Sequence, residues 1–201
     1  MTYRAKKNFA SILPFAVWMA MMLLLPPTSE CYAARALVTA LLLAPCLVYL
    51  ERHHGVIHRN KTLLPELCWG VAVGLVVLAL WVYPDRFEFY QRWFVFGEGG
   101  TPDIAQSDRV FKIVRLVGSG LVISVAEELF FRRWLMRFAG FWWMVVLFAA
   151  EHDRWLVAAL AGALYGWLAL RKGLVSAIIA HATTNLALGV YVIETHSWQF
   201  W

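Results

Sequence analysis

The chain has 201 residues, of which 61% are hydrophobic and 15% are charged, with 11 tryptophans and a net charge of +5. This composition excludes an ordinary soluble domain, in which about a quarter of the residues are charged and about half are apolar. The lysines and arginines stand in short clusters between apolar runs, so no basic stripe is left for nucleic acid. We therefore predict an all-α, polytopic helical bundle integral to a membrane, forming one domain over residues 1–201.

About seven apolar segments are predicted to form transmembrane helices. A proline pair and a basic loop separate the first three, and short turns separate the last four. Between the two sets lies a polar connection, residues 85–108, whose first half is predicted to lie in the membrane interface as a short amphipathic helix. The predicted helices cover residues 9–25, 32–50, 64–82, 110–138, 141–150, 155–170 and 174–193.

If each predicted helix crosses the membrane, most clusters of basic residues fall on the same side of it. The N-terminus, the loop that follows residue 50, the arginines at 132–137 and the Arg171–Lys172 turn all fall on that side. Lysine and arginine are enriched in cytoplasmic loops, so the N-terminus is predicted to be cytoplasmic. The acidic-leaning connection 85–108 falls on the opposite side.

Three groups of polar residues interrupt the apolar segments in the second half of the chain. Ionisable groups at membrane depth are costly, so each is expected to have a partner or a task. Taken singly, each group has a structural explanation, such as a charge pair at the interface or a hydrogen bond between helices. The groups are Glu127-Glu128-x-x-x-Arg132, Phe148-x-x-x-His152 and His181-x-x-x-Asn185.

Helix geometry predicts that these groups lie at similar depth. Glu127 lies 13 residues before Gly140 and His152 lies 12 residues after it. If Gly140 is the turn of a helical hairpin, both side chains lie about 18–20 Å from that turn. Measured from the basic turn at 171–173, His181 and Asn185 lie about 12 and 18 Å in, on one helix face. Together the groups therefore predict one shared site.

The residue types suit hydrolysis of an acyl bond. A glutamate removed from water is a fitting general base, and a nearby histidine can orient the attacking water. A second histidine and an asparagine can donate hydrogen bonds to a developing oxyanion. No serine or cysteine stands in a nucleophile motif, which favours activated water as the nucleophile.

Metal is the main alternative at this site. Zinc could be held by one carboxylate oxygen and two imidazole nitrogens, from Glu127, His152 and His181. The chain has no H-E-x-x-H pair, which makes a metal site a less specific interpretation. We therefore predict water activation without a metal or other cofactor, and we keep a zinc-dependent intramembrane metalloprotease as the alternative.

The three motifs, in this order, resemble those of the CAAX prenyl protease and bacteriocin-processing family, also called the Abi family. This family comprises the intramembrane type II CAAX endopeptidases and their relatives. The resemblance covers roughly residues 110–193, which it identifies as a catalytic core of four helices. The compact size and the many tryptophans are also similar to CAAX-protease-related proteins of bacterial exosortase systems.

The resemblance implies a role for each motif residue. Glu127 is expected to be the general base, assisted by His152. His181 and Asn185 are expected to form the oxyanion hole. Together these residues are predicted to act as an intramembrane endopeptidase in a cell inner membrane, cutting a membrane-anchored peptide or protein that carries a lipid group or lacks one.

The same resemblance gives Glu128 and Arg132 supporting roles beside the base. The polar turn that contains His152 predicts a site close to one membrane face, and the distribution of charge makes that the non-cytoplasmic face. Two other functions compete with proteolysis. One is a non-catalytic scaffold or immunity-type protein with the same fold, and the other is a proton-coupled transporter, although the chain shows no inverted repeat.

Overall fold

The computed structural model describes residues 2–55, 63–96 and 103–201, and all regular elements within these ranges are helical. This confirms the all-α prediction. Two π-helical turns, Gly118–Ile123 and Leu129–Leu135, interrupt one long helical rod. The α-helices are α1 Tyr3–Leu24, α2 Ser29–His54, α3 Leu63–Val82, α4 Glu88–Phe94, α5 Arg109–Val117, α6 Ser124–Glu128, α7 Met136–Ala139, α8 Phe141–Ala150, α9 Trp155–Arg171 and α10 Leu174–Thr195. Short 3-10 turns occur at Pro84–Arg86, after α3, and at Trp198–Phe200, after α10.

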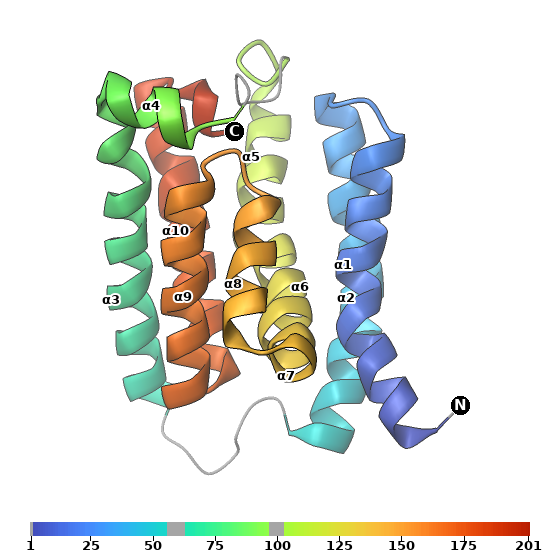
Figure 1. The fold of residues 1–201 in the computed structure, drawn as a ribbon. Helices are drawn as coiled ribbons and strands as arrows, with labels where there is room; N and C mark the ends of the chain where they lie inside the picture. The colour runs from blue at the N-terminus through green and yellow to red at the C-terminus, as the bar shows by residue number, and fades with distance from the viewer. Residues whose placement is uncertain (1, 56–62, 97–102) are drawn as a thin grey trace.

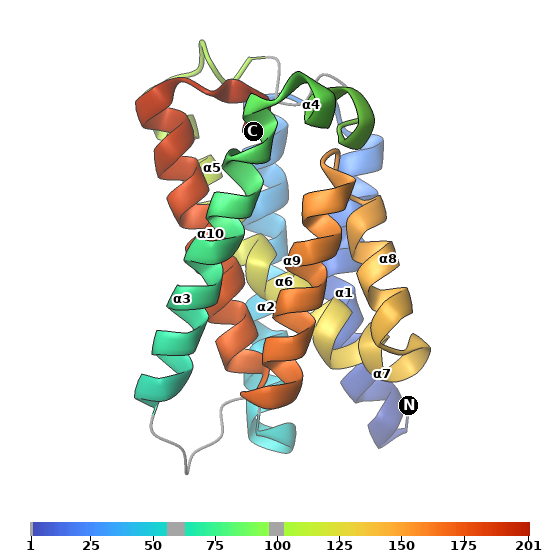
Figure 2. The same cartoon turned by 60° about the vertical axis from the view of Figure 1, so that its left-hand side comes forward.

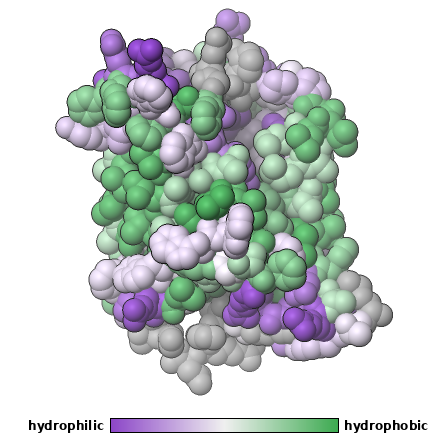
Figure 3. Space-filling model, viewed as in Figure 1, coloured by the Kyte–Doolittle hydropathy of each residue, from purple (hydrophilic) through white to green (hydrophobic). Residues whose placement is uncertain are grey.

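Within the described ranges, four helices are long and apolar enough to cross a bilayer: α1, α2, α3 and α10. On the face of the molecule shown in Figure 3, apolar side chains occupy the middle, and polar residues gather above and below them. An apolar middle between polar ends matches the hydrocarbon layer of a membrane and its two headgroup regions. The chain is therefore a multi-pass membrane protein.

The other three predicted spans, at residues 110–138, 141–150 and 155–170, are helical, but each is either interrupted or shorter than the four long helices. The rod from α5 to α7 carries the charged motif and both π turns, and α9 has 17 residues. Helix α8 has only 10 residues, so it rises about 15 Å, roughly half of a hydrocarbon core of about 30 Å. The predicted count of seven crossings therefore stays a prediction.

The helices form two groups around a central rod. α1 and α2 lie side by side on one flank, while α3, α9 and α10 pack together on the other (Figures 1 and 2). The rod α5–α7 contacts helices of both flanks, and α8 lies beside α9. The short amphipathic helix predicted early in the 85–108 connection is present as α4, which lies across one end of the bundle (Figure 1).

Two glycines reverse the chain at the opposite end of the bundle. Gly140, with φ +91°, separates α7 from α8, and Gly173, with φ +107°, separates α9 from α10. A side chain would strain the backbone at these positive φ angles, which explains why glycine occupies both turns. The hairpin predicted at Gly140 therefore forms, and it sets α8 antiparallel to the rod.

A third glycine allows α3 and α10 to pack closely. A Cβ atom on Gly74 would lie 2.5 Å from the Ala180 carbonyl oxygen and 2.7 Å from the Thr183 Cβ. The Gly74 carbonyl accepts a 2.8 Å hydrogen bond from the Thr184 hydroxyl, which itself accepts a 2.7 Å bond from the Tyr165 hydroxyl. These contacts join α3, α9 and α10 directly behind the predicted site.

We expect Gly74→Val to lower the midpoint of thermal unfolding in detergent. Forcing a side chain into a packed contact costs about 1–3 kcal/mol, which corresponds to roughly 5 °C for a chain of this size. Ala72→Val, at an exposed position on the same helix, is the matched control and should leave the midpoint within about 1 °C. Equal midpoints for the two variants would contradict the close α3–α10 contact.

Candidate active site

The two acids of the first motif lie on α6, a helix of only five residues between the two π turns. Each π turn takes up an extra residue, which rotates the side chains that follow relative to a regular helix. Glu127 is 7% exposed and Glu128 is fully buried. Both acids therefore point into the protein, where they face opposite nitrogens of the His181 imidazole.

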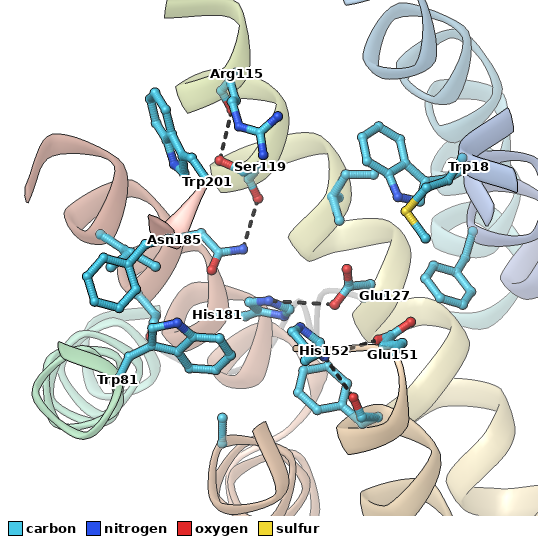
Figure 4. A pocket seen from close by; sticks show the side chains of 18 of the residues that line it. Trp18, Trp81, Arg115, Ser119, Glu127, Glu151, His152, His181, Asn185 and Trp201 are labelled. Carbon is cyan, nitrogen blue, oxygen red and sulfur yellow. Dashed lines mark hydrogen bonds and ion pairs between the residues drawn. The ribbon is translucent and has the colours of Figure 1, made fainter. Parts of the chain in front are cut away.

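Glu127 faces a cavity of about 280 Å³ in the centre of the bundle (Figure 4). The cavity is lined by all four residues predicted to be catalytic: Glu127 from α6, His152 from the turn after α8, and His181 and Asn185 from α10. The structure thus brings together residues that are up to 58 positions apart in the chain. The roles of the individual residues stay predictions.

The two predicted supporting residues, Glu128 and Arg132, lie on the far side of His181 from the cavity. The Nδ1 of His181 and the Oε1 of Glu128 are 2.9 Å apart, and an Nη1 of Arg132 lies 3.0 Å from the same Oε1. Because a carboxylate only accepts, His181 carries its proton on Nδ1 here. Its Nε2 is left facing Glu127, 3.7 Å from that residue's Oε2. Glu128 therefore sets both the tautomer and the orientation of this imidazole.

Arg132 is 2% exposed, and its surroundings compensate for the burial of its charge. Its guanidinium carbon lies 4.3 Å from the ring centroid of Phe148 and 5.4 Å from that of Tyr165. Arg132 also donates a 3.4 Å hydrogen bond to the carbonyl of Gly162 on α9. A buried guanidinium with a carboxylate and two aromatic faces is well stabilised, so this arginine fixes Glu128 in place.

His152 reaches the cavity from the turn between α8 and α9. Its Nδ1 lies 2.8 Å from the carbonyl oxygen of Phe148, which can only accept, so Nδ1 is the donor. Its Nε2 then keeps a free lone pair, as a residue that orients a water molecule requires. Trp81 packs edge-on against the imidazole, with ring centroids 5.7 Å apart.

The turn that carries His152 is anchored from outside the cavity. Arg154 forms a buried 2.8 Å ion pair with Asp85, in the 3-10 turn after α3. The same arginine donates to the carbonyl of Gln199 at 3.1 Å, and the backbone of Phe96 donates to the carbonyl of Asp153 at 2.8 Å. Three segments distant in sequence thus hold this turn, which the sequence motif did not indicate.

Asn185 is oriented differently from the prediction for an oxyanion hole. Its side-chain amide nitrogen donates to the carbonyl of Ser119 and to the hydroxyl of Ser124, both at 3.1 Å. The Ser124 hydroxyl itself donates to the Ser119 carbonyl at 2.9 Å, so it can only accept from Asn185. Stabilising an oxyanion would require Asn185 to exchange one of these bonds, whereas the Nε2 of His181 already faces the cavity and would donate once a second proton is bound there.

Glu151 is a site residue that sequence reasoning missed. Its side chain is only 12% exposed, it lines the cavity, and its Oε1 lies 3.9 Å from Nδ1 of His152. The sequence showed it only as part of an unusually polar turn. Two carboxylates, Glu127 and Glu151, therefore face one small cavity, and a proton or a cation between them would relieve their repulsion.

Three potential metal ligands meet at this point. One side-chain atom each from Glu127, Glu151 and His152 lie within 4.8 Å of one another. Glu127 and His152 belong to the predicted zinc set, whereas the third member, His181, is replaced here by Glu151. Carboxylates and imidazoles are common ligands of divalent cations, so these three residues fit a metal.

Comparison with known proteins identifies part of this chain. Residues 109–187 match the family model described as Rce1-like, type II CAAX prenyl endopeptidase Rce1-like. The match runs from the start of α5 into α10 and contains all residues of the three motifs. No curated protein and no solved structure matches the chain. The family resemblance of the motifs is thereby confirmed, while the exosortase-associated subgroup stays a prediction.

Proposed function

We propose that this chain hydrolyses a peptide bond of a membrane-anchored substrate with activated water, a proposal supported by the match of residues 109–187 to the Rce1-like model of type II CAAX prenyl endopeptidases. One observation carries the proposal: Glu127, His152 and His181 converge on one cavity, and both histidines are held in place by contacts outside it. Such preorganisation is what a general base and an oxyanion donor need.

The reaction begins with a water molecule between Glu127 and the Nε2 of His152. Glu127 takes one proton from the water while His152 accepts a hydrogen bond from the other, and the oxygen attacks the carbonyl carbon of the peptide. The new C–O bond places negative charge on the carbonyl oxygen. His181, when protonated at Nε2 as well, donates to that oxygen, and the carboxylate of Glu128 stabilises the imidazolium.

The tetrahedral intermediate then breaks down. The protonated carboxyl of Glu127 delivers its proton to the nitrogen of the scissile bond, and the C–N bond breaks. The products are a carboxylic acid and an amine, and Glu127 returns to its ionised form. Every proton taken from water is thereby returned to product or solvent, so the cycle needs no covalent enzyme intermediate.

The shape of the cavity favours a substrate from the membrane. The cavity extends from Glu127 to Arg115 and Trp201, near the end of the bundle that carries the C-terminus (Figures 1 and 4). Aromatic and methionine side chains of α1 and the C-terminal turn line that path: Trp18, Met19, Met22, Phe200 and Trp201. This end lies opposite the basic turns, so we place the cleaved segment at the non-cytoplasmic side of the inner membrane.

A metallopeptidase is the second candidate, favoured by the cluster of Glu127, Glu151 and His152. A zinc ion held there would supply Lewis-acid activation of a water molecule. His181 and Glu128 would keep the roles derived above, because neither belongs to the cluster. The two candidates share a substrate and differ in their response to a chelator.

The first experiment measures cleavage by the wild-type protein in lipid nanodiscs. The probe is a prenylated peptide that ends in a CAAX sequence, the substrate class in the family description, with fragments identified by mass spectrometry. We expect cleavage at one bond, unchanged by 1,10-phenanthroline, because the proposed base needs no cation. Activity lost to the chelator and restored by zinc would favour the metallopeptidase. Absence of cleavage of prenylated, unprenylated and unrelated membrane-tethered peptides would favour the scaffold function.

A further inference from the structure

A second cavity, of about 500 Å³, lies at the end of the bundle opposite the C-terminus. Among the described residues, six cationic side chains and a single carboxylate, Glu66, line it. The cations come from three separate parts of the chain and are Lys7, Arg132, Arg133, Arg137, Arg171 and Lys172. Of these, Arg132 is paired with Glu128, and Glu51 lies close enough to act on the charge of Arg133, so cations still outnumber acids at this cavity. Like charges gathered in one cavity repel, so an anion would stabilise the arrangement.

Two further observations point to an anionic ligand. Arg133, a lining residue, has a buried Nε with no hydrogen-bond partner in the described part of the chain. Helix α10, 22 residues long, begins at this cavity with Leu174 and Val175 in its lining, and no side chain caps its first turn. The free backbone N–H groups at such a helix start carry partial positive charge and bind phosphate groups.

The remaining lining indicates where the anion comes from. Apolar side chains stand beside the cations: Met136, Ala169, Leu170, Leu174 and Val175. The cavity lies at the ends of α1, α3 and α10, which are long and apolar enough to cross a bilayer, so we expect it at the depth of the lipid headgroups. A phosphate attached to acyl chains satisfies both parts of the lining, whereas free phosphate satisfies only the cations. Basic pockets between transmembrane helices on the cytoplasmic side bind anionic headgroups.

We propose that this cavity is a binding site for the phosphate headgroup of an anionic phospholipid. The ligand holds together the start of α1, the end of the rod and the α9–α10 turn, which otherwise repel one another. The inference does not depend on peptidase activity, because the cations that form the site lie outside the catalytic cavity. Only Arg132 connects the two sites.

The test compares lipid binding by two variants that lose the same charge. Arg137→Gln/Lys172→Gln removes two cations from the cavity, whereas Arg4→Gln/Lys6→Gln removes two exposed cations from the same end of α1. Binding of phosphatidylglycerol and phosphatidylcholine to detergent-purified protein is measured by native mass spectrometry. We expect wild type and the control to prefer phosphatidylglycerol and the cavity variant to bind it about tenfold or more weakly.

Thermal unfolding without lipid provides the second readout. Removal of mutually repelling cations should leave the unfolding midpoint of the lipid-free cavity variant unchanged or raised, while the stabilisation by phosphatidylglycerol is lost. Lys7→Gln alone tests the same site if the double variant fails to fold. Equal lipid preference in both double variants, or equal binding of the two lipids by wild type, would overturn the proposal. Displacement of phosphatidylglycerol by millimolar inorganic phosphate would show that free phosphate, not lipid, is the ligand.

Discussion

Replacing Glu127 by glutamine is expected to lower the rate of peptide cleavage by at least about 10³-fold, within the range attributed to a general base. Glutamine has the same shape but cannot take a proton from water. Glu127 is the one acid of the motif whose carboxylate faces the cavity, and its Oε2 has no hydrogen-bond partner among the described residues. The rate is measured in nanodiscs under single-turnover conditions, so that substrate binding does not mask the chemical step.

The same substitution should not destabilise the protein. A buried carboxylate without a hydrogen-bond partner costs free energy, and a neutral amide of equal size reduces that cost. We therefore expect Glu127→Gln to unfold at the wild-type temperature or above it, while activity is lost. Glu194→Gln, at an exposed position on α10, is the control and should change neither property. Turnover like that of wild type in Glu127→Gln would remove Glu127 as the base.

Glu151→Gln distinguishes the role of Glu151 from that of Glu127, the other carboxylate in the cavity. If Glu127 acts alone as the base, loss of Glu151 should reduce the rate far less than loss of Glu127 does. If both carboxylates hold a cation, the two variants should lose activity together and should lose metal binding together. The pair of rates therefore also distinguishes the two proposed functions.

Breaking the Glu128–Arg132 pair is expected to have the largest effect on stability. Glu128→Leu leaves a guanidinium in a fully buried position without its carboxylate. Removal of one partner from a buried ion pair costs about 3–5 kcal/mol, which lowers the unfolding midpoint by roughly 10 °C in a chain of this length. The midpoint is measured by thermal unfolding in detergent, with Glu30→Leu on an exposed surface of α2 as the control.

The double variant Glu128→Met/Arg132→Met tests the function of the pair apart from its stability. Replacing a whole buried ion pair by apolar side chains often restores stability, so the unfolding midpoint should recover most of the loss. Cleavage should not recover, because His181 has lost the acceptor that sets its tautomer. Recovery of both properties would show that the pair is structural only.

The sequence predicted the helices and the shared site because both depend on which residues are apolar or charged and on how they are spaced. Ionisable side chains are expelled from lipid, so acids and histidines in apolar helices must face the protein interior. Depth along a helix follows from counting residues, and the positions of Glu127 and His152 on either side of Gly140 therefore predicted their meeting. The burial of charged side chains and the depth of a residue along its helix both follow from residue type and residue spacing alone, so both can be predicted from the sequence.

The direction in which each side chain points around its helix axis could not be predicted in the same way. Two π turns flank α6, where Glu127 faces the cavity and Glu128 faces His181. Gly118 and Gly120 weaken the regular helix in the first turn, but the second turn has no such signal in its sequence. The position of both turns depends on packing against α1, α2 and α10, helices that are distant in sequence. The short α8 likewise depends on the anchored turn that follows it.

The order of residues was enough to predict a helical membrane bundle with an acid, two imidazoles and an amide at one depth, because the cost of charge in lipid leaves few other places for them. The packing of the helices, by contrast, determines which side-chain atoms face the cavity. It joined Glu151 to the cavity, directed the amide of Asn185 toward Ser119 and Ser124, and fixed the tautomer of His181 through Glu128. Those choices rest on hydrogen bonds between segments far apart in the chain, and such bonds exist only once the helices have packed.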